Sequence, residues 1–165
     1  MTITFQGKPI TLKGTLLHTG DTMPEFTLTD NALNPVHSRD LTGTRVFLAL
    51  PSLDTGVCDL EVKTFHQKAS ELKGVFLYAV SLDLPFAQTR WCAAAGVDKV
   101  KTLSDYRDRS FGQATGTLID ELALLTRAVF VVNQNNQIVY AEYVPEITDH
   151  PNYQAVYQKL NELVF

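Results

Sequence analysis

The stretch RVFLALPSLDTGVC, residues 45–58, contains the strongest structural signal in the sequence. Its first part is almost continuously apolar and ends at Pro51, which is typical of a strand buried on both faces. Beyond the proline, apolar residues recur at intervals of three and four, as they do along one face of a helix. The members of this helical stripe are Cys58, Val62, Phe65, Ala69 and Leu72. The stretch therefore predicts a buried strand, a short loop and a helix over 55–72 that is closed by Gly74.

The same alternation continues on both sides of this stretch. Towards the N-terminus we expect a hairpin formed by 2–5 and 9–12, and a strand at 25–29. Towards the C-terminus we expect strands at 75–82, 101–103, 127–132 and 137–143, and helices at 85–95, 107–113 and 152–163. Phe47, Phe76 and Phe130 are expected in the core. This order predicts one α/β domain over 1–165, in which a central mixed β-sheet is flanked by helices on both faces; a thioredoxin-like fold with an N-terminal β-hairpin matches it.

The composition excludes some classes of function before any motif is considered. The 165 residues include 14 Lys and Arg against 18 Asp and Glu, and no basic run occurs among them. This balance argues against a nucleic-acid or anionic-membrane binder. The first residues lack the basic and apolar segments of a secretory signal, so we expect a cytoplasmic protein.

The sequence contains only two cysteines, Cys58 and Cys92, whose spacing fits neither a CxxC motif nor a zinc site. Cys58 falls near the start of the predicted helix, where unpaired backbone N–H groups and the helix dipole stabilise a thiolate. Inert packing explains it equally well, because Cys58 also belongs to the apolar stripe. Cys92 shares its helix face with Gln88 and Thr89, so packing explains it less well. The pair is therefore either two buried thiols or a redox pair.

Several motifs resemble those of the peroxiredoxin family, and more narrowly its bacterial thiol peroxidase subfamily of the atypical two-cysteine type. Pro51, Thr55 and Cys58 stand in the spacing of the PxxxTxxC active-site motif. The stretch SLDLPFAQTRWC, residues 81–92, is similar to the subfamily's segment around its second cysteine. The stretch RAVFVV, residues 127–132, resembles the strand that carries the family's active-site arginine, and VPEIT at 144–148 also matches. The resemblance covers nearly the whole chain in the right order.

The resemblance implies a catalytic cycle and a role for each matched residue. Cys58 thiolate would attack a hydroperoxide and become a sulfenic acid, and Cys92 would convert it into an intrachain disulfide that thioredoxin reduces. Thr55 would orient the thiolate and the peroxide, Arg127 would supply positive charge, and Pro51 would shield the sulfur from water. The resemblance implies no metal, flavin or nucleotide cofactor, and a homodimer.

Simpler roles exist for the same residues. Thr55 could simply cap the helix, and Pro51 could simply end a strand. Arg127 could be a surface residue at the end of a strand. Two other functions remain for the whole chain. A general thiol–disulfide oxidoreductase of thioredoxin-like fold is disfavoured by the absence of CxxC, and a non-enzymatic binding protein is disfavoured by the intact motif.

Overall fold

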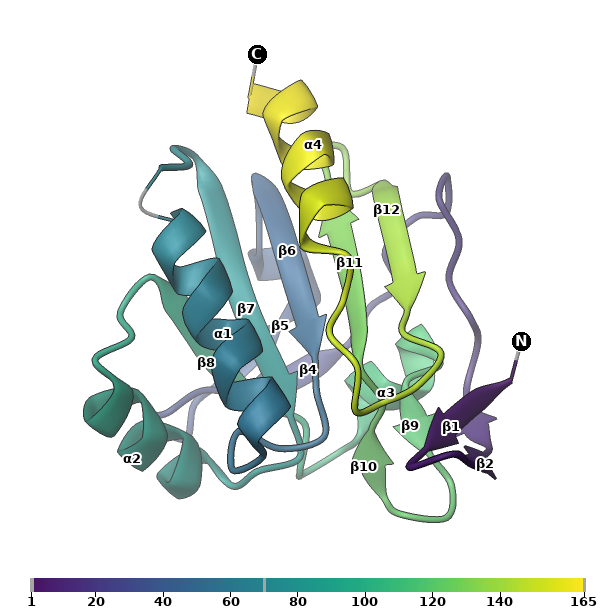
Figure 1. Ribbon diagram of the computed structural model, residues 1–165. Coiled ribbons are helices and arrows are strands. Elements are labelled where there is room, and N and C mark those ends of the chain that lie inside the picture. Colours follow the sequence, from purple (N-terminus) through teal and green to yellow (C-terminus); the bar gives the residue numbers. More distant parts are fainter. Residues whose placement is uncertain (1, 70, 165) are drawn as a thin grey trace.

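The computed structural model describes residues 2–69 and 71–164, and it is built around a seven-stranded mixed sheet (Figure 1). From one edge to the other the strands are β12 (Ile138–Tyr143), β11 (Ala128–Val132), β6 (Thr44–Ala49), β7 (Val75–Ser81), β8 (Val100–Ser104), β4 (Thr27–Thr29) and β5 (Pro35–His37). Strands β6, β7 and β8 are parallel, and the remaining neighbours pair antiparallel.

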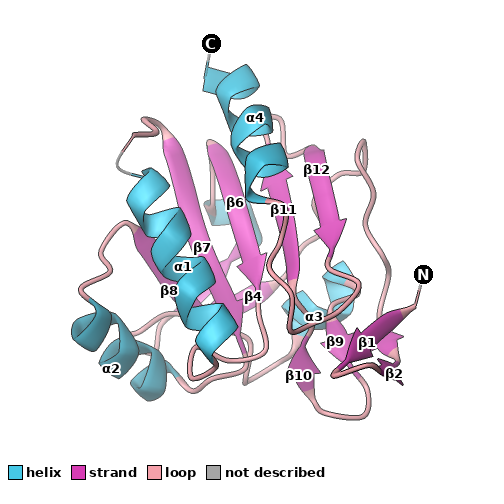
Figure 2. Cartoon of the chain, viewed as in Figure 1, coloured by secondary structure: helices cyan, strands magenta, loops and turns pink. Residues whose placement is uncertain are grey.

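Helices cover both faces of this sheet (Figure 2). On one face lie α1 (Gly56–Ala69) and α4 (Tyr153–Val164), with α2 (Pro85–Ala95) beside β8, while α3 (Ser110–Thr115) lies on the other face. Short elements complete the chain: β1 (Ile3–Phe5), β2 (Lys8–Ile10), β3 (Leu12–Lys13), β9 (Leu118–Ile119), β10 (Leu124–Leu125) and a 3₁₀ turn at Ser38–Asp40.

The core consists of one apolar cluster on each face of the sheet, and β6 contributes to both. Val46 and Leu48 point towards α1 and α4, whereas Phe47 and Ala49 point towards α3. All four are essentially inaccessible to solvent. Burying each large side chain of this kind contributes about 1.5–3 kcal/mol, so the strand that leads to Cys58 is firmly anchored.

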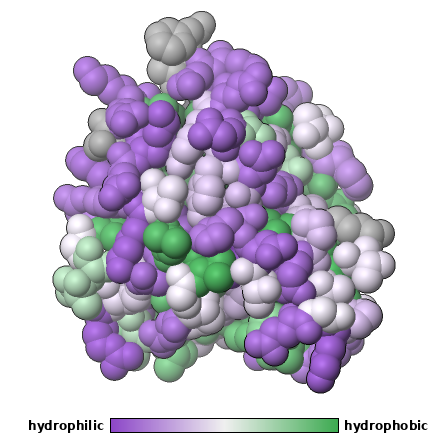
Figure 3. All heavy atoms as spheres, in the orientation of Figure 1, coloured by the Kyte–Doolittle hydropathy of each residue, from purple (hydrophilic) through white to green (hydrophobic). Residues whose placement is uncertain are grey.

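The predicted architecture is confirmed, including the mixed sheet, the thioredoxin-like order of elements and the N-terminal hairpin formed by β1 and β2. Helix α2 has the predicted bounds because Pro85 starts it and Gly96, at φ 68°, caps it in the left-handed conformation. Polar side chains cover most of the face that carries α1 and α4 (Figure 3). Among the described residues, no helix combines the length and hydrophobicity needed to cross a membrane.

Three details of the prediction are wrong. Helix α1 ends at Ala69 rather than at Leu72, which packs on the core from the turn that follows. The short helix begins at Ser110 because the Asp105 carboxylate accepts the N–H groups of Phe111 and Gly112, at 3.1 and 2.8 Å. Phe76 is 51% exposed, and it lies near the start of β7 with its ring beside Gly43.

Candidate active site

Cys58 lies in the first turn of α1 and is fully buried. Its side chain belongs to the apolar cluster with Val62 and Phe65. The prediction that Cys58 packs in the apolar stripe of the helix is therefore confirmed. Its backbone N–H donates a 3.3 Å hydrogen bond to Thr55 Oγ1. Because Thr55 immediately precedes the helix, this bond is an N-cap, and it fixes the turn that holds the sulfur.

Two other residues of the predicted motif, Thr55 and Pro51, lie beside this turn, and neither makes a hydrogen bond to the sulfur. The Thr55 side chain is exposed, and its hydroxyl donates to the Ser52 carbonyl oxygen at 3.2 Å. Pro51 is buried where β6 passes into the loop. The structure therefore brings both residues to the Cys58 turn, with the threonine hydroxyl proton directed at the loop backbone.

Arg127 immediately precedes β11, and its guanidinium contacts the sulfur directly. Its Nη2 donates to Cys58 Sγ at 3.2 Å, its Nη1 donates to Glu61 Oε2 at 3.2 Å, and its Nε donates to the Ile147 carbonyl oxygen at 2.8 Å. The side chain is 2% exposed, so the alternative of a surface arginine is wrong. A buried guanidinium at this distance stabilises negative charge on the sulfur.

The loop that orients Arg127 is held by the N-terminal hairpin. The Val144 N–H donates to the Arg127 carbonyl oxygen at 3.0 Å, and Ile147 accepts from the guanidinium. Between them, the Glu146 carboxylate accepts the N–H groups of Thr148 and Gly7, at 2.9 and 2.8 Å. These bonds lower the pKa of Glu146 to about 2, so the carboxylate stays ionised and remains an acceptor for the hairpin at physiological pH.

Glu61 completes the buried cluster, and the sequence motifs did not reveal it. It lies three residues after Cys58 on α1, and it is fully buried. Its Oε2 accepts from Arg127, whereas its Oε1 has no hydrogen-bond partner among the residues that the structure describes. Burial raises the pKa of Glu61 to about 8, and Glu142 adds to the rise, although the charge of Arg127 opposes it. The signal that would have found it is its spacing, because residues three apart share a helix face.

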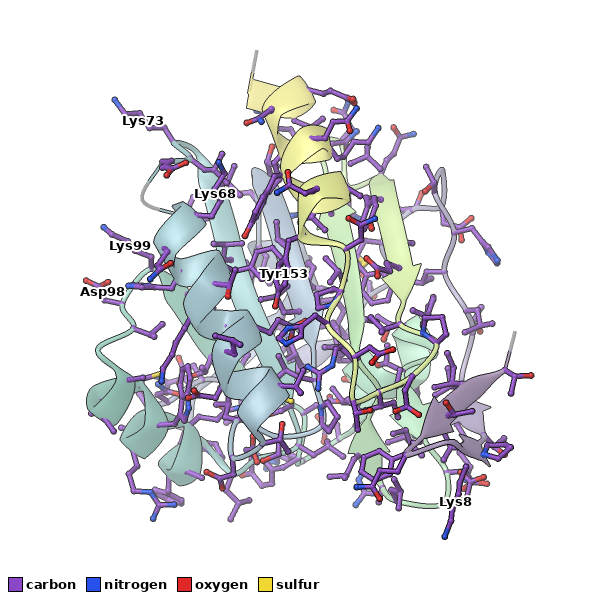
Figure 4. All side chains as sticks on the ribbon, viewed as in Figure 1. Lys8, Lys68, Lys73, Asp98, Lys99 and Tyr153 are labelled. Atoms are coloured by element: carbon purple, nitrogen blue, oxygen red, sulfur yellow. The ribbon has the colours of Figure 1, made fainter. Side chains whose placement is uncertain are left out.

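Tyr153 closes the cluster from the side of α4. It points towards α1 (Figure 4), and its ring packs against Phe65 with the centroids 5.4 Å apart. Burial, together with the charge of Glu61, raises the pKa of Tyr153 to about 12. This phenol therefore remains neutral at physiological pH and adds no charge to the site.

Cys92 lies on α2 and is partly buried, with Sγ 3.4 Å from Thr102 Oγ1. Cys58 and Cys92 are both free thiols. Three hydrogen bonds tie the loop and first turn around Cys58 to the α2 region. Trp91 Nε1 donates to Asp59 Oδ1 at 2.9 Å, and the Asp83 carboxylate accepts the Leu53 N–H at 2.9 Å and the Ser52 hydroxyl at 2.7 Å. Residues next to the two cysteines are thus joined by hydrogen bonds.

Among residues 2–69 and 71–164, no three His, Cys, Asp or Glu side chains lie close enough together to form a metal site.

Comparisons with known proteins agree on one family. The Redoxin family model matches residues 18–157. The chain is 55% identical to a thiol peroxidase of Clostridium acetobutylicum over 158 residues, 96% of each protein, and 49% identical to one of Bacillus subtilis over 98% of each. Its fold is similar to that of a peroxiredoxin-like protein from Aquifex aeolicus, with a TM-score of 0.92 and 36% identity over 99% of this chain and 97% of that one.

Proposed function

The chain belongs to the Redoxin family, within its bacterial thiol peroxidases, and from that premise we propose how its own residues reduce a peroxide. It is a peroxiredoxin-type peroxidase of thioredoxin-like fold. A hydroperoxide as substrate and a thioredoxin-type reductant are the general partners of this class. The assignment of each step to a residue is our proposal, and the 3.2 Å contact between Arg127 Nη2 and Cys58 Sγ carries it.

Cys58 performs the oxidation step. Its thiolate attacks the terminal oxygen of hydrogen peroxide or an organic hydroperoxide, the O–O bond breaks, and the sulfur becomes a sulfenic acid. Arg127 holds the sulfur as a thiolate beforehand and stabilises the negative charge that develops on the departing oxygen. Thr55 turns its hydroxyl from the Ser52 carbonyl towards the peroxide, and Pro51 keeps water from the sulfur.

Cys92 performs the resolving step by attacking the Cys58 sulfenic acid, which forms an intrachain disulfide and releases water. Thioredoxin then reduces this disulfide, and we place the cycle in the cytoplasm, where that system keeps thiols reduced. Because Cys58 is fully buried on one helix and Cys92 lies on another, the first turn of α1 and part of α2 unwind during this step. We further propose a homodimer, supported by the exposed apolar side chains of Leu84 and Phe86.

Replacing Cys92 by serine tests the cycle. With thioredoxin and its reductase present, we expect the Cys92→Ser variant to consume about one equivalent of peroxide per chain and then stall, because the sulfenic acid has no internal thiol to resolve it. Dimedone trapping and mass spectrometry would locate the modification on Cys58. Sustained thioredoxin-linked turnover by this variant, without any added small thiol, would contradict the intrachain disulfide.

In this proposal, the hydrogen bond between Trp91 and Asp59 limits the rate at which the Cys58–Cys92 disulfide forms. It joins the residue before Cys92 to the residue after Cys58, so it must break when the two helices open. A hydrogen bond to a charged group contributes about 1.5–3 kcal/mol, and its loss in Trp91→Phe should speed disulfide formation by roughly tenfold. Rapid quenching with a thiol-blocking reagent and mass spectrometry would follow the disulfide over time.

The matched control is Arg90→Gln, which alters an exposed residue of the same helix outside the proposed dimer contact. This variant should form the disulfide at the wild-type rate, and both variants should form the sulfenic acid as fast as the wild type. If Trp91→Phe leaves the resolution rate unchanged, the hydrogen bond is not broken before the rate-limiting step.

A further inference from the structure

Two acids share one buried cation in this site. Cys58 and Glu61 lie three residues apart on α1, both are fully buried, and both accept a hydrogen bond from the Arg127 guanidinium. The third contact of that guanidinium is the neutral carbonyl oxygen of Ile147. The cluster therefore contains one positive charge and two groups that are each able to become negative.

The charge of this cluster changes during catalysis. With Cys58 as a thiolate, an ionised Glu61 would leave one net negative charge in a site closed to water, which burial strongly disfavours. The neighbouring titratable groups Glu142 and Tyr153 do not compensate this negative charge. Glu142, on β12, adds negative potential, and the Tyr153 phenol on α4 is neutral at physiological pH. Once Cys58 is oxidised, its sulfur is neutral. Within the cluster, the positive charge of Arg127 is then balanced by the negative charge of the Glu61 carboxylate.

We propose that Glu61 stores the proton of the peroxidase reaction, carrying it while Cys58 is a thiolate and releasing it when Cys58 is oxidised. In the oxidation step the thiolate, the Glu61 carboxylic acid and a hydroperoxide give a sulfenic acid, the Glu61 carboxylate and an alcohol. The S–O bond forms, the O–O bond breaks, and the departing oxygen gains one proton while Glu61 loses one. When thioredoxin's dithiol reduces the disulfide, Cys58 leaves as a thiolate, and the proton that remains returns to Glu61.

The position of Glu61 fits this role better than a purely structural one. A carboxylate that served only to orient Arg127 would be expected to have both oxygens satisfied, yet Oε1 has no hydrogen-bond partner within residues 2–69 and 71–164. Burial also raises the pKa of Glu61, against the opposing charge of Arg127, so this carboxyl group holds a proton more readily than an exposed one does. A thiolate on Cys58 raises this pKa further, since it competes for Arg127, and oxidation to a neutral sulfur removes that additional rise.

The inference rests on the proposed function, and a proton count tests it separately. The Cys92→Ser background stops the reaction at the sulfenic acid, so the count covers the oxidation step alone. Reduced protein in weak buffer near neutral pH is mixed with hydrogen peroxide and a pH-indicator dye, and the thiolate is measured beforehand by its ultraviolet absorbance. We expect almost no proton uptake from solvent in Cys92→Ser, and uptake of about one proton per oxidised thiolate when Glu61→Gln is added.

Infrared difference spectra of the same Cys92→Ser protein provide a second reading that needs no Glu61 variant. The reduced protein should show the C=O stretch of a protonated carboxyl group, and this band should vanish on oxidation. Glu71→Gln, which changes an exposed acid in the turn after α1, should behave like its parent in both experiments. Uptake of about one proton per thiolate without any Glu61 substitution, or a reduced spectrum without the band, would overturn the inference. Failure of Cys58 to form a sulfenic acid at all would instead refute the proposed function.

Discussion

Replacing Cys58 by serine will abolish thioredoxin-linked peroxide reduction. A serine hydroxyl at the same position stays protonated and is a poor nucleophile towards peroxide oxygen, so the chemical step loses its attacking group. We expect peroxide consumption to fall by at least about 10⁴-fold, the scale on which enzymes depend on their nucleophile. A coupled assay that follows NADPH oxidation through thioredoxin reductase and thioredoxin would measure this loss.

The Cys58→Ser comparison also separates the proposed cycle from its rivals. Serine is close in size to cysteine, and its oxygen can accept the Arg127 N–H, so thermal unfolding should show a folded protein. Full turnover by this folded variant would mean that the chemistry does not pass through Cys58. A general thiol–disulfide oxidoreductase is assayed by the reduction of protein disulfides, and with Cys92 alone it would perform this no better than with both cysteines. The peroxidase cycle, in contrast, requires Cys58 for its first step.

The fold was largely predictable because its signals are local. The apolar run before Pro51 predicted β6, since a strand buried on both faces has no polar positions to interrupt it. Pro85 and Gly96 predicted the bounds of α2, because each fixes a backbone angle that a helix end requires. The hairpin of β9 and β10 escaped prediction for the opposite reason: β9 pairs with β3, more than 100 residues away in the chain.

The site was predictable only in part, for the same physical reason. The motif residues were found because their spacing along the chain is distinctive. By contrast, the bond from Trp91 to Asp59 joins two helices that no local pattern connects. Likewise, the carbonyl of Ile147 has no signature in sequence, yet it fixes the Arg127 side chain through Nε. Glu61 was obscured by the apolar stripe around it, although its place three residues after Cys58 puts it on the same side of α1.

Replacing Arg127 by glutamine is expected to damage both activity and stability, by two separable routes. The variant loses the charge that stabilises the thiolate and the departing oxygen, so peroxide reduction should fall by about 10²–10³-fold. It also leaves Glu61 buried without its cation. Where the pH is high enough to ionise Glu61, removing its partner from the buried ion pair costs about 3–5 kcal/mol, and urea unfolding at alkaline pH would measure the loss.

The pH dependence and a double variant distinguish these two routes. Without Arg127, the pKa of Glu61 rises above its present value near 8, because the one interaction that lowers it by charge is gone. A carboxyl group whose folded pKa is raised stabilises the fold at low pH, and that stability is lost as the pH rises from its unfolded value towards the folded one. The Arg127→Gln variant should therefore lose stability steeply between roughly pH 5 and 9, whereas Arg127→Gln with Glu61→Gln should not.

The double variant should regain stability but not activity, because glutamine at both positions removes the buried charge without restoring a cation beside the sulfur. Arg107→Gln, which changes an exposed arginine, should match the wild type in both assays. If the double variant recovered peroxidase activity together with stability, Arg127 would serve the fold alone. The 3.2 Å contact between its guanidinium and the Cys58 sulfur would then have no catalytic role.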